Sequence, residues 1–161
     1  MLVGILSDTH GHADTMQTAV KLLQNRGAEY FLHCGDVGAT DVLDALAGLQ
    51  AAFVFGNTDW NRAGLQTYAE HLGIICYGEF GEFQLDSKSF ALLHGDDGAL
   101  KRRLLDEQRH DYLLQGHTHE VMDRTIGKTR LINPGALFRA AQKTVVLLDT
   151  RKDIVEFLRT T

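Results

Sequence analysis

The sequence predicts an α/β fold in which two β-sheets pack against each other and helices cover their outer faces. Two observations carry this prediction. In the first part of the chain, short apolar runs alternate with amphipathic segments, which is the rhythm of a βαβαβ unit. From about residue 74 the pattern changes to β-rich pieces interrupted by one helix-like segment, which indicates a second sheet.

The βαβαβ part has five segments, which are in chain order a strand at 2–6, a helix at 14–26, a strand at 30–33, a helix at 40–49 and a strand at 52–55. The first helix shows the clearest pattern. Its apolar residues repeat at i, i+4 and i+7, as expected for one buried face: Met16, Val20 and Leu23. Asp14 and Gln17 are expected to form a capping box at its start, and Gly27 is expected to end it.

The β-rich part contains strand-like pieces at 74–95 and 121–135, with a helix-like insert at 98–108. The only proline, Pro134, is followed by glycine, which suits a type II turn. Two apolar runs, 144–150 and 153–159, close the chain and are expected to form a hairpin.

Length, composition and charge limit the classes of protein to which this sequence can belong. A length of 161 residues predicts one domain, 1–161, and shares of 44% hydrophobic and 23% charged residues are those of a globular protein. A net charge of -5 argues against a broad nucleic-acid or membrane surface. Cys34 and Cys76 are expected to be buried, reduced thiols. The opening apolar run is too short for a signal peptide or a membrane span, so we expect a cytoplasmic protein, and a homo-oligomer is left open.

Polar residues with metal-binding chemistry follow five of the apolar runs. Because the carboxyl ends of strands in α/β sheets gather ligands, these residues are expected to converge at one place. They are Asp8, His10, Asp36, Asn57, His94, His117 and His119. Within each of the pairs 8/10 and 117/119, an extended backbone would point both side chains the same way. Glycines at 35, 56, 95 and 116 would permit tight turns or close backbone approach.

Taken singly, each of these endings is an ordinary turn signal, and a lone histidine is usually structural. Taken together they favour a metal site, because burying several carboxylates side by side without a cation is costly. Four imidazoles with three carboxylate or carboxamide groups exceed what one tetrahedral zinc ion needs. Two metal ions that share a carboxylate fit the number of candidate ligands.

The order of these motifs resembles that of the calcineurin-like metallophosphoesterases. The matching elements are Asp8-x-His10, Gly35-Asp36, Gly56-Asn57, His94-Gly95 and Gly116-His117-x-His119, and the turn at 132–137 is similar to that of the family's small phosphodiesterase branch. The resemblance implies a four-layer αββα sandwich of two mixed sheets. It also implies ligands for one metal (Asp8, His10 and His119), ligands for a second (Asn57, His94 and His117) and a bridge (Asp36).

The function implied is hydrolysis of a small phosphate diester by hydroxide that two divalent cations generate from water. Asp36, Asn57 and His94 are the residues to which we assign catalytic roles. Manganese is the first choice of metal, with iron, zinc, nickel or cobalt as alternatives according to supply. Two other functions remain open: a phosphomonoesterase, and a non-catalytic protein-interaction scaffold such as the related retromer subunit.

Thr58 and Ala136 depart from the resemblance, and the departure at Thr58 bears on the chemistry. Many members of the superfamily carry histidine after the Gly-Asn motif, where it assists the leaving group, but this chain has Thr58. A threonine hydroxyl is a poor general acid near neutral pH, so the source of the leaving group's proton is left open. Trp60, the only tryptophan, could stack on an aromatic leaving group or pack beneath its loop.

Overall fold

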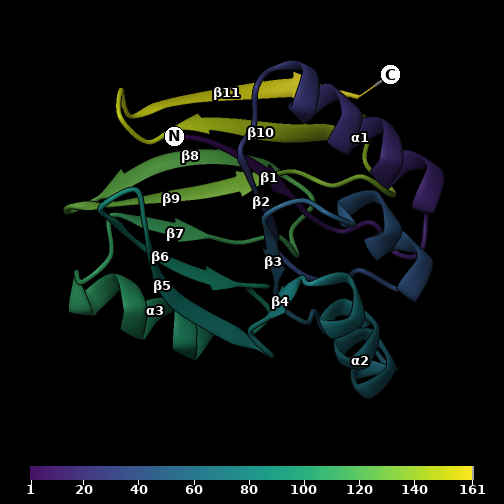
Figure 1. The fold of residues 1–161 in the computed structure, drawn as a ribbon. Helices are drawn as coiled ribbons and strands as arrows, with labels where there is room; N and C mark the ends of the chain where they lie inside the picture. Colours follow the sequence, from purple (N-terminus) through teal and green to yellow (C-terminus); the bar gives the residue numbers. More distant parts are fainter. Residues whose placement is uncertain (161) are drawn as a thin grey trace.

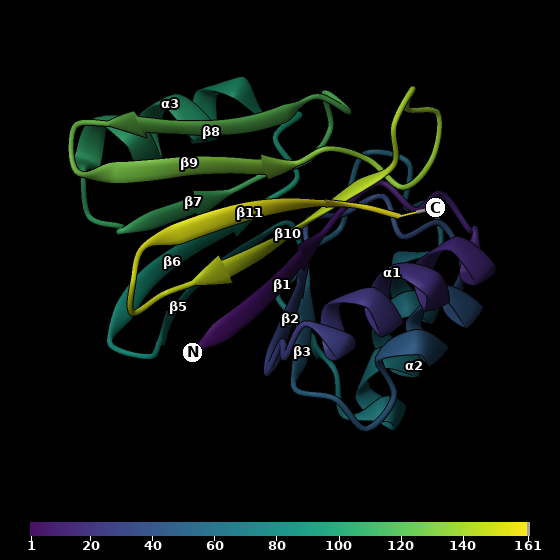
Figure 2. The ribbon, with the colours of Figure 1, turned by 90° about the horizontal axis from the view of Figure 1, so that it is seen from above.

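The computed structural model describes residues 1–160 and consists of two β-sheets packed face to face, with helices on the outer face of each (Figures 1 and 2). Helices α1 and α2 cover one sheet and α3 covers the other. The predicted four-layer αββα sandwich is confirmed.

The first sheet has six strands in the order β11-β10-β1-β2-β3-β4. Strands β1 to β4 are parallel, whereas β10 and β11 form an antiparallel hairpin that adds to the β1 edge. Their bounds are β1 (Leu2–Leu6), β2 (Tyr30–His33), β3 (Ala51–Phe53), β4 (Ile75–Cys76), β10 (Thr144–Asp149) and β11 (Ile154–Arg159). The three parallel strands of the predicted βαβαβ unit and the predicted closing hairpin are therefore present.

The second sheet has five strands in the order β5-β6-β7-β9-β8. Strands β6, β7 and β9 are parallel, and an antiparallel strand borders them on each side. Their bounds are β5 (Phe80–Leu85), β6 (Lys88–Leu93), β7 (Tyr112–Leu114), β8 (Val121–Ile126) and β9 (Thr129–Pro134). Both sheets are mixed, as the family resemblance implies.

Three apolar layers hold the sandwich together. The central layer lies between the sheets, where Ile5 and Leu32 of the first sheet belong to one cluster with Phe90 and Leu114 of the second. A second layer joins the first sheet to α1 (Ala13–Asn25), the 3₁₀ helix η1 (Thr40–Leu46) and α2 (Arg62–Leu72). A third, smaller layer joins the second sheet to α3 (Gly98–Glu107). Burial of these side chains supplies the main driving force for folding.

Helix α1 buries the predicted face, since Met16, Val20 and Leu23 are all in the core. The predicted capping box was wrong, because the helix begins earlier: His12 is the N-cap residue, and Asp14 already lies in the first turn. An acidic residue there still interacts favourably with the positive end of the helix dipole. Gly27 follows the helix with a φ of +87°, which confirms its role in ending it.

Two helices differ from the sequence prediction. The segment predicted as a helix at 40–49 forms the 3₁₀ helix η1. Helix α2 was missed, although it has clear end signals: the Asn61 side chain accepts a hydrogen bond from the Gly64 N–H, and Gly73 ends the helix in the left-handed conformation. Within residues 1–160, no helix is long and apolar enough to cross a membrane.

Candidate metal centre

All seven candidate ligands lie in loops that follow carboxyl ends of strands, and the structure brings them together. Asp8 and His10 follow β1, and Asp36 follows β2. The other loops follow β3, β6 and β7, and supply Asn57, His94, His117 and His119. We call these seven residues the candidate metal centre. They come from both sheets, so the centre lies where the two sheets meet.

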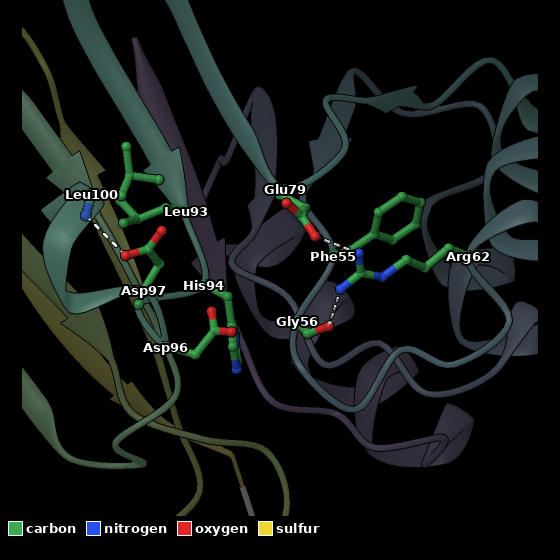
Figure 3. Close-up of a pocket in the computed structure, with 10 residues that line it drawn as sticks. Phe55, Gly56, Arg62, Glu79, Leu93, His94, Asp96, Asp97 and Leu100 are labelled. Carbon is green, nitrogen blue, oxygen red and sulfur yellow. Dashed lines mark hydrogen bonds and ion pairs between the residues drawn. The ribbon is translucent and has the colours of Figure 1, made fainter.

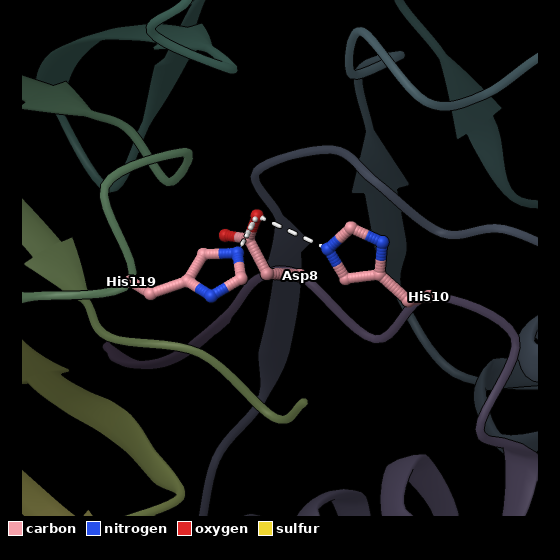
Figure 4. A group of neighbouring side chains, drawn as sticks. All are labelled: Asp8, His10 and His119. Atoms are coloured by element: carbon pink, nitrogen blue, oxygen red, sulfur yellow. Dashed lines mark ion pairs between the residues drawn. The ribbon is translucent and has the colours of Figure 1, made fainter. Parts of the chain in front are cut away.

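Three of these residues form a first ligand group, Asp8, His10 and His119 (Figure 4). The Oδ1 atom of Asp8 lies 3.2 Å from Nε2 of His119 and 3.8 Å from Nε2 of His10. The Asp8 carboxylate is fully buried, and its other oxygen accepts hydrogen bonds from the Ser7 hydroxyl at 2.5 Å and from the His117 N–H at 3.1 Å. Ser7 therefore orients a candidate ligand, as expected for a structural hydroxyl.

Asn57, His94 and His117 form a second ligand group. The Oδ1 atom of Asn57 lies 3.0 Å from Nε2 of His94 and 3.1 Å from Nδ1 of His117. His94 donates its Nδ1–H to the Cys34 carbonyl at 2.8 Å. This hydrogen bond fixes the tautomer of the neutral ring and leaves a lone pair on Nε2, which faces the centre.

Asp36 lies between the two ligand groups. Its Oδ2 atom is 3.5 Å from Nε2 of His10 and 3.4 Å from Nε2 of His94. Its other oxygen accepts the Thr58 N–H at 2.9 Å, which holds the carboxylate in place. One carboxylate oxygen therefore faces a histidine of each group, which is the position that a bridging ligand requires.

The electrostatics of the centre favour occupation by cations. Among residues 1–160, Oδ1 of Asp8 and Nε2 of His10 are buried without a hydrogen-bond partner. In the second group, the lone pair of neutral His94 faces oxygen atoms of Asn57 and Asp36, and such lone pairs repel unless a proton or a cation lies between them. Oxygen and imidazole donors without thiolate suit manganese, iron, zinc, nickel or cobalt. The residues present thus fit a pair of divalent metal ions.

Charge interactions shift the pKa values of two residues in the centre. Burial by itself would raise the pKa of Asp36, but the interaction with His94 in its protonated form and the hydrogen bond from the Thr58 N–H outweigh it and hold that pKa well below its usual range. Burial by itself would lower the pKa of His94, but Asp36 and the Cys34 carbonyl outweigh it and raise that pKa. Asp36 is therefore anionic at neutral pH and available as a ligand.

The backbone of the centre differs from the one that the sequence suggested. The expectation that the pairs 8/10 and 117/119 are extended was wrong, because all four residues have positive φ: +57° at Asp8, +49° at His10, +69° at His117 and +59° at His119. Asp36 has a φ of +55°. This conformation is uncommon outside glycine, and strained residues cluster at functional sites.

Two glycines make room for the carboxylates. A Cβ atom on Gly56 would lie 2.0 Å from Oδ1 of Asp36, and one on Gly116 would lie 2.5 Å from Oδ2 of Asp8. Neither position could accept alanine without displacing a candidate ligand. The predicted need for close backbone approach at these glycines is confirmed.

Sequence reasoning missed a buried carboxylate that ties two loops of the centre together. Asp59 accepts hydrogen bonds from the backbone N–H groups of Val37 at 3.2 Å, Gly38 at 2.7 Å and Gly56 at 2.8 Å. The first two follow Asp36 and the third precedes Asn57, so Asp59 fixes a bridging candidate relative to the second ligand group. Its place two residues after Asn57 was the only signal in the sequence.

Two further buried side chains hold the loops of the centre. Asn133, at the end of β9, donates from Nδ2 to the Gly116 carbonyl at 2.8 Å, and its Oδ1 accepts the Gly135 N–H at 2.9 Å. His33, at the end of β2, accepts the Gly35 N–H at Nδ1, and its Nε2 lies 2.5 Å from the Thr9 hydroxyl. Burial lowers the pKa of His33 to about 3, so this ring stays neutral.

Other residues singled out in the sequence are not among the candidate ligands. Trp60 is 88% exposed, so the alternative in which it packs beneath its loop was wrong. Cys34 is buried as expected, and burial raises its thiol pKa, whereas Cys76 is only half-buried. Thr58 lies beside the first ligand group, with its hydroxyl 3.4 Å from Nδ1 of His10.

Comparison with known proteins identifies the family of this chain. The family model described as the calcineurin-like phosphoesterase superfamily domain matches residues 1–153. The chain is similar to a protein of Methanocaldococcus jannaschii named as a phosphodiesterase, with 28% identity over 94% of this chain and 95% of the relative. It is also similar to a Methanothermobacter thermautotrophicus protein named "probable metallophosphoesterase", with 32% identity over 99% of this chain and 93% of the relative.

Among solved structures, the chain is similar to one described as a novel archaeal phosphodiesterase. The two superpose with a TM-score of 0.92 at 25% identity, and the match covers 99% of each chain. The likeness therefore extends over both sheets and includes the loops that carry the candidate metal centre.

Proposed function

The chain belongs to the calcineurin-like phosphoesterase superfamily, and on that premise we propose that it is a phosphodiesterase whose candidate metal centre holds two divalent ions. The observation that carries the proposal is the position of Asp36, whose Oδ2 atom lies 3.5 Å from Nε2 of His10 and 3.4 Å from Nε2 of His94. A single metal site would not need a carboxylate between two complete ligand groups.

The seven residues divide between the two metals as the family resemblance implies. Asp8, His10 and His119 would hold one ion, and Asn57, His94 and His117 would hold the other, with Asp36 shared. Two such ions supply Lewis acidity, which lowers the pKa of water and neutralises phosphoryl oxygens. Manganese is our first choice, because oxygen and imidazole ligands suit it, and the alternatives named above remain compatible with the same donors.

The chain's own residues position the reactants. The Cys34 carbonyl fixes the tautomer of His94, and the Thr58 N–H fixes the carboxylate of Asp36, so both ligand atoms are oriented before substrate arrives. Asp59 keeps the loops after β2 and β3 in register. Thr58 supplies no acid of suitable pKa, so the substrate's leaving group should be one that departs easily as an anion.

The test is a screen of chromogenic phosphate esters with and without added manganese. We expect metal-dependent hydrolysis of diesters that exceeds hydrolysis of the matched monoesters. Faster hydrolysis of monoesters would favour a phosphomonoesterase instead. Absence of hydrolysis in protein with both metal ions bound would favour the scaffold function. A cytoplasmic location and the one-domain organisation of 1–161 stay predictions.

A further inference from the structure

A cavity of about 200 Å³ lies directly beside the candidate metal centre (Figure 3). It is lined by His94 of the centre and by Gly56, which precedes Asn57, so a molecule held there would meet the second ligand group. Its apolar lining comes from Phe55, Leu93 and Leu100. A substrate bound at the metals could therefore place one of its substituents in this cavity.

The size of the cavity limits that substituent. At about 200 Å³ the cavity lies below the range of about 300–1,000 Å³ that is typical of small-molecule sites, so it suits a substituent of only a few non-hydrogen atoms. This is the size of a short alcohol.

The charges around the cavity are mainly negative. Carboxylates of Glu79, Asp96 and Asp97 line it, against the single cationic side chain of Arg62. Asp97 accepts hydrogen bonds from N–H groups at the start of α3. Asp96, by contrast, is exposed and has no hydrogen-bond or ion-pair partner within residues 1–160. Its charge is thus free to act on a bound molecule.

Arg62 is not free to attract an anion. Its guanidinium forms an ion pair with Glu79, approaches the Gly56 carbonyl at 3.5 Å and lies 5.5 Å from the centre of the Phe55 ring. Figure 3 shows this group on the wall opposite Asp96 and Asp97. Moving it to pair with an anionic substituent would break these contacts, so its charge is already compensated where it lies.

We propose that this cavity is the subsite for the second alcohol of the phosphodiester, and that it selects a small cationic alcohol over neutral or anionic ones. The inference rests on the proposed function, because it assigns a place to a substituent of the substrate. The phosphate would be held at the metal centre, while Asp96 and Asp97, neither of which forms an ion pair within residues 1–160, attract a positive charge a few bonds away.

The experiment compares three p-nitrophenyl phosphodiesters with the same leaving group. Their second substituents are 2-(trimethylammonio)ethyl, the isosteric neutral 3,3-dimethylbutyl, and 2-carboxyethyl. We expect kcat/KM for the cationic ester to exceed that for the neutral isostere by about threefold or more, and the anionic ester to be slowest. The preference should shrink as salt is raised, because exposed charges are screened. Equal values for the cationic and neutral esters would overturn the proposal.

Single substitutions distinguish the effect of a charge at the cavity from the effect of the protein's overall surface charge. Asp96→Asn should reduce the cationic preference by roughly two- to fivefold. The matched control is Asp106→Asn, which removes the same charge about 13 Å further along α3. This distance exceeds a Debye length of about 8 Å, so the control variant should keep the preference for the cationic ester. Arg62→Met should leave the anionic ester slowest, whereas loss of anionic-ester hydrolysis alone would show that Arg62 binds anions.

A binding measurement makes the two proposals distinguishable. Choline should shift the methyl resonances of Leu93 and Leu100, and 3,3-dimethylbutanol should shift them less at the same concentration. If all three esters are hydrolysed but neither the difference in kcat/KM nor the difference in methyl shifts is found, the inference is overturned and the proposed function stands. Methyl shifts without hydrolysis of any ester would overturn both the proposed function and the subsite's role in it.

Discussion

Asp36 contacts both ligand groups through one oxygen atom, and its other oxygen is held by the Thr58 N–H. This arrangement explains why a carboxylate is needed at this position: an amide would offer one neutral oxygen and one N–H group that cannot ligate. The positive φ at Asp36 is part of the same constraint, because it turns the side chain toward both histidines.

Replacing the carboxylate tests that role. Asp36→Asn should lower diesterase turnover by at least about a hundredfold with the fold retained, because both ions lose a shared anionic ligand. Activity, metal content and circular dichroism should be measured together. The control is Asp41→Asn, an exposed carboxylate on η1. Wild-type rates and metal content in the Asp36 variant would show that this residue is not the bridge.

Thr58 gives the second prediction at this scale. Its hydroxyl is 3.4 Å from Nδ1 of His10, so a larger side chain here would reach the edge of the centre. General acid help is typically worth about 10² to 10⁴ in rate, so Thr58→His should accelerate esters with poor leaving groups more than esters with good ones.

The measurement uses a series of phosphodiesters whose leaving groups differ in pKa. The rate should depend less steeply on leaving-group pKa in the variant than in the wild type. Metal content must be determined in parallel, because an added imidazole can capture an ion. An unchanged slope in a correctly folded variant with both ions bound would show that position 58 does not face the leaving group.

At the scale of elements, the centre depends on ties between loops that follow different strands. Asp59 joins the loops after β2 and β3, Asn133 holds the loop after β7, and His33 joins the end of β2 to the loop after β1. The ties made by Asp59 and Asn133 satisfy backbone groups in buried loops, which otherwise lack partners.

Asp59→Ala should both destabilise the protein and weaken its metal binding. It leaves the N–H groups of Val37, Gly38 and Gly56 without their acceptor. The hydrogen bonds from Val37 and Gly56 are buried, and each unsatisfied buried group costs about 1–3 kcal/mol, so we expect a loss of about 2–6 kcal/mol in the free energy of unfolding. Denaturant unfolding and manganese titration measure the two effects. Asp106→Ala, on the exposed side of α3, is the control, and equal behaviour of the two variants would refute the role of Asp59.

His33 predicts a pH dependence of stability. Burial lowers the pKa of His33 in the folded protein to about 3. In the unfolded chain the pKa of this residue is about 6.5, so on acidification the unfolded chain is protonated here at a higher pH than the folded protein. The stability contributed by neutral His33 is therefore complete above pH 6.5 and lost as pH falls toward 3, at up to about 1.4 kcal/mol per pH unit.

The comparison is between wild type and His33→Asn, with a chelator present throughout. The variant should be less stable at pH 7 because the Thr9 and Gly35 contacts change, but its free energy of unfolding should fall less steeply between pH 6.5 and 4. Parallel curves for the two proteins would mean that His33 does not titrate as proposed.

Across the whole molecule, the sequence predicted the architecture better than its local details. Apolar periodicity identified the strands, and polar residues at strand ends identified the seven candidate ligands, because topology brings such ends together. The backbone at Asp8 and His117 was not predictable, since positive φ there depends on contacts from distant loops. The same holds for Asp59, whose partners lie around residues 37 and 56 and become neighbours only after folding.

The central claim is that the candidate metal centre binds two divalent ions and that both are needed for phosphodiester hydrolysis. The most direct measurement is a manganese titration of chelator-stripped protein, with bound metal and diesterase activity determined on the same samples. We predict negligible activity in the stripped protein and recovery that saturates at two ions per chain. Full activity in the stripped protein, or saturation at one ion per chain, would contradict this account.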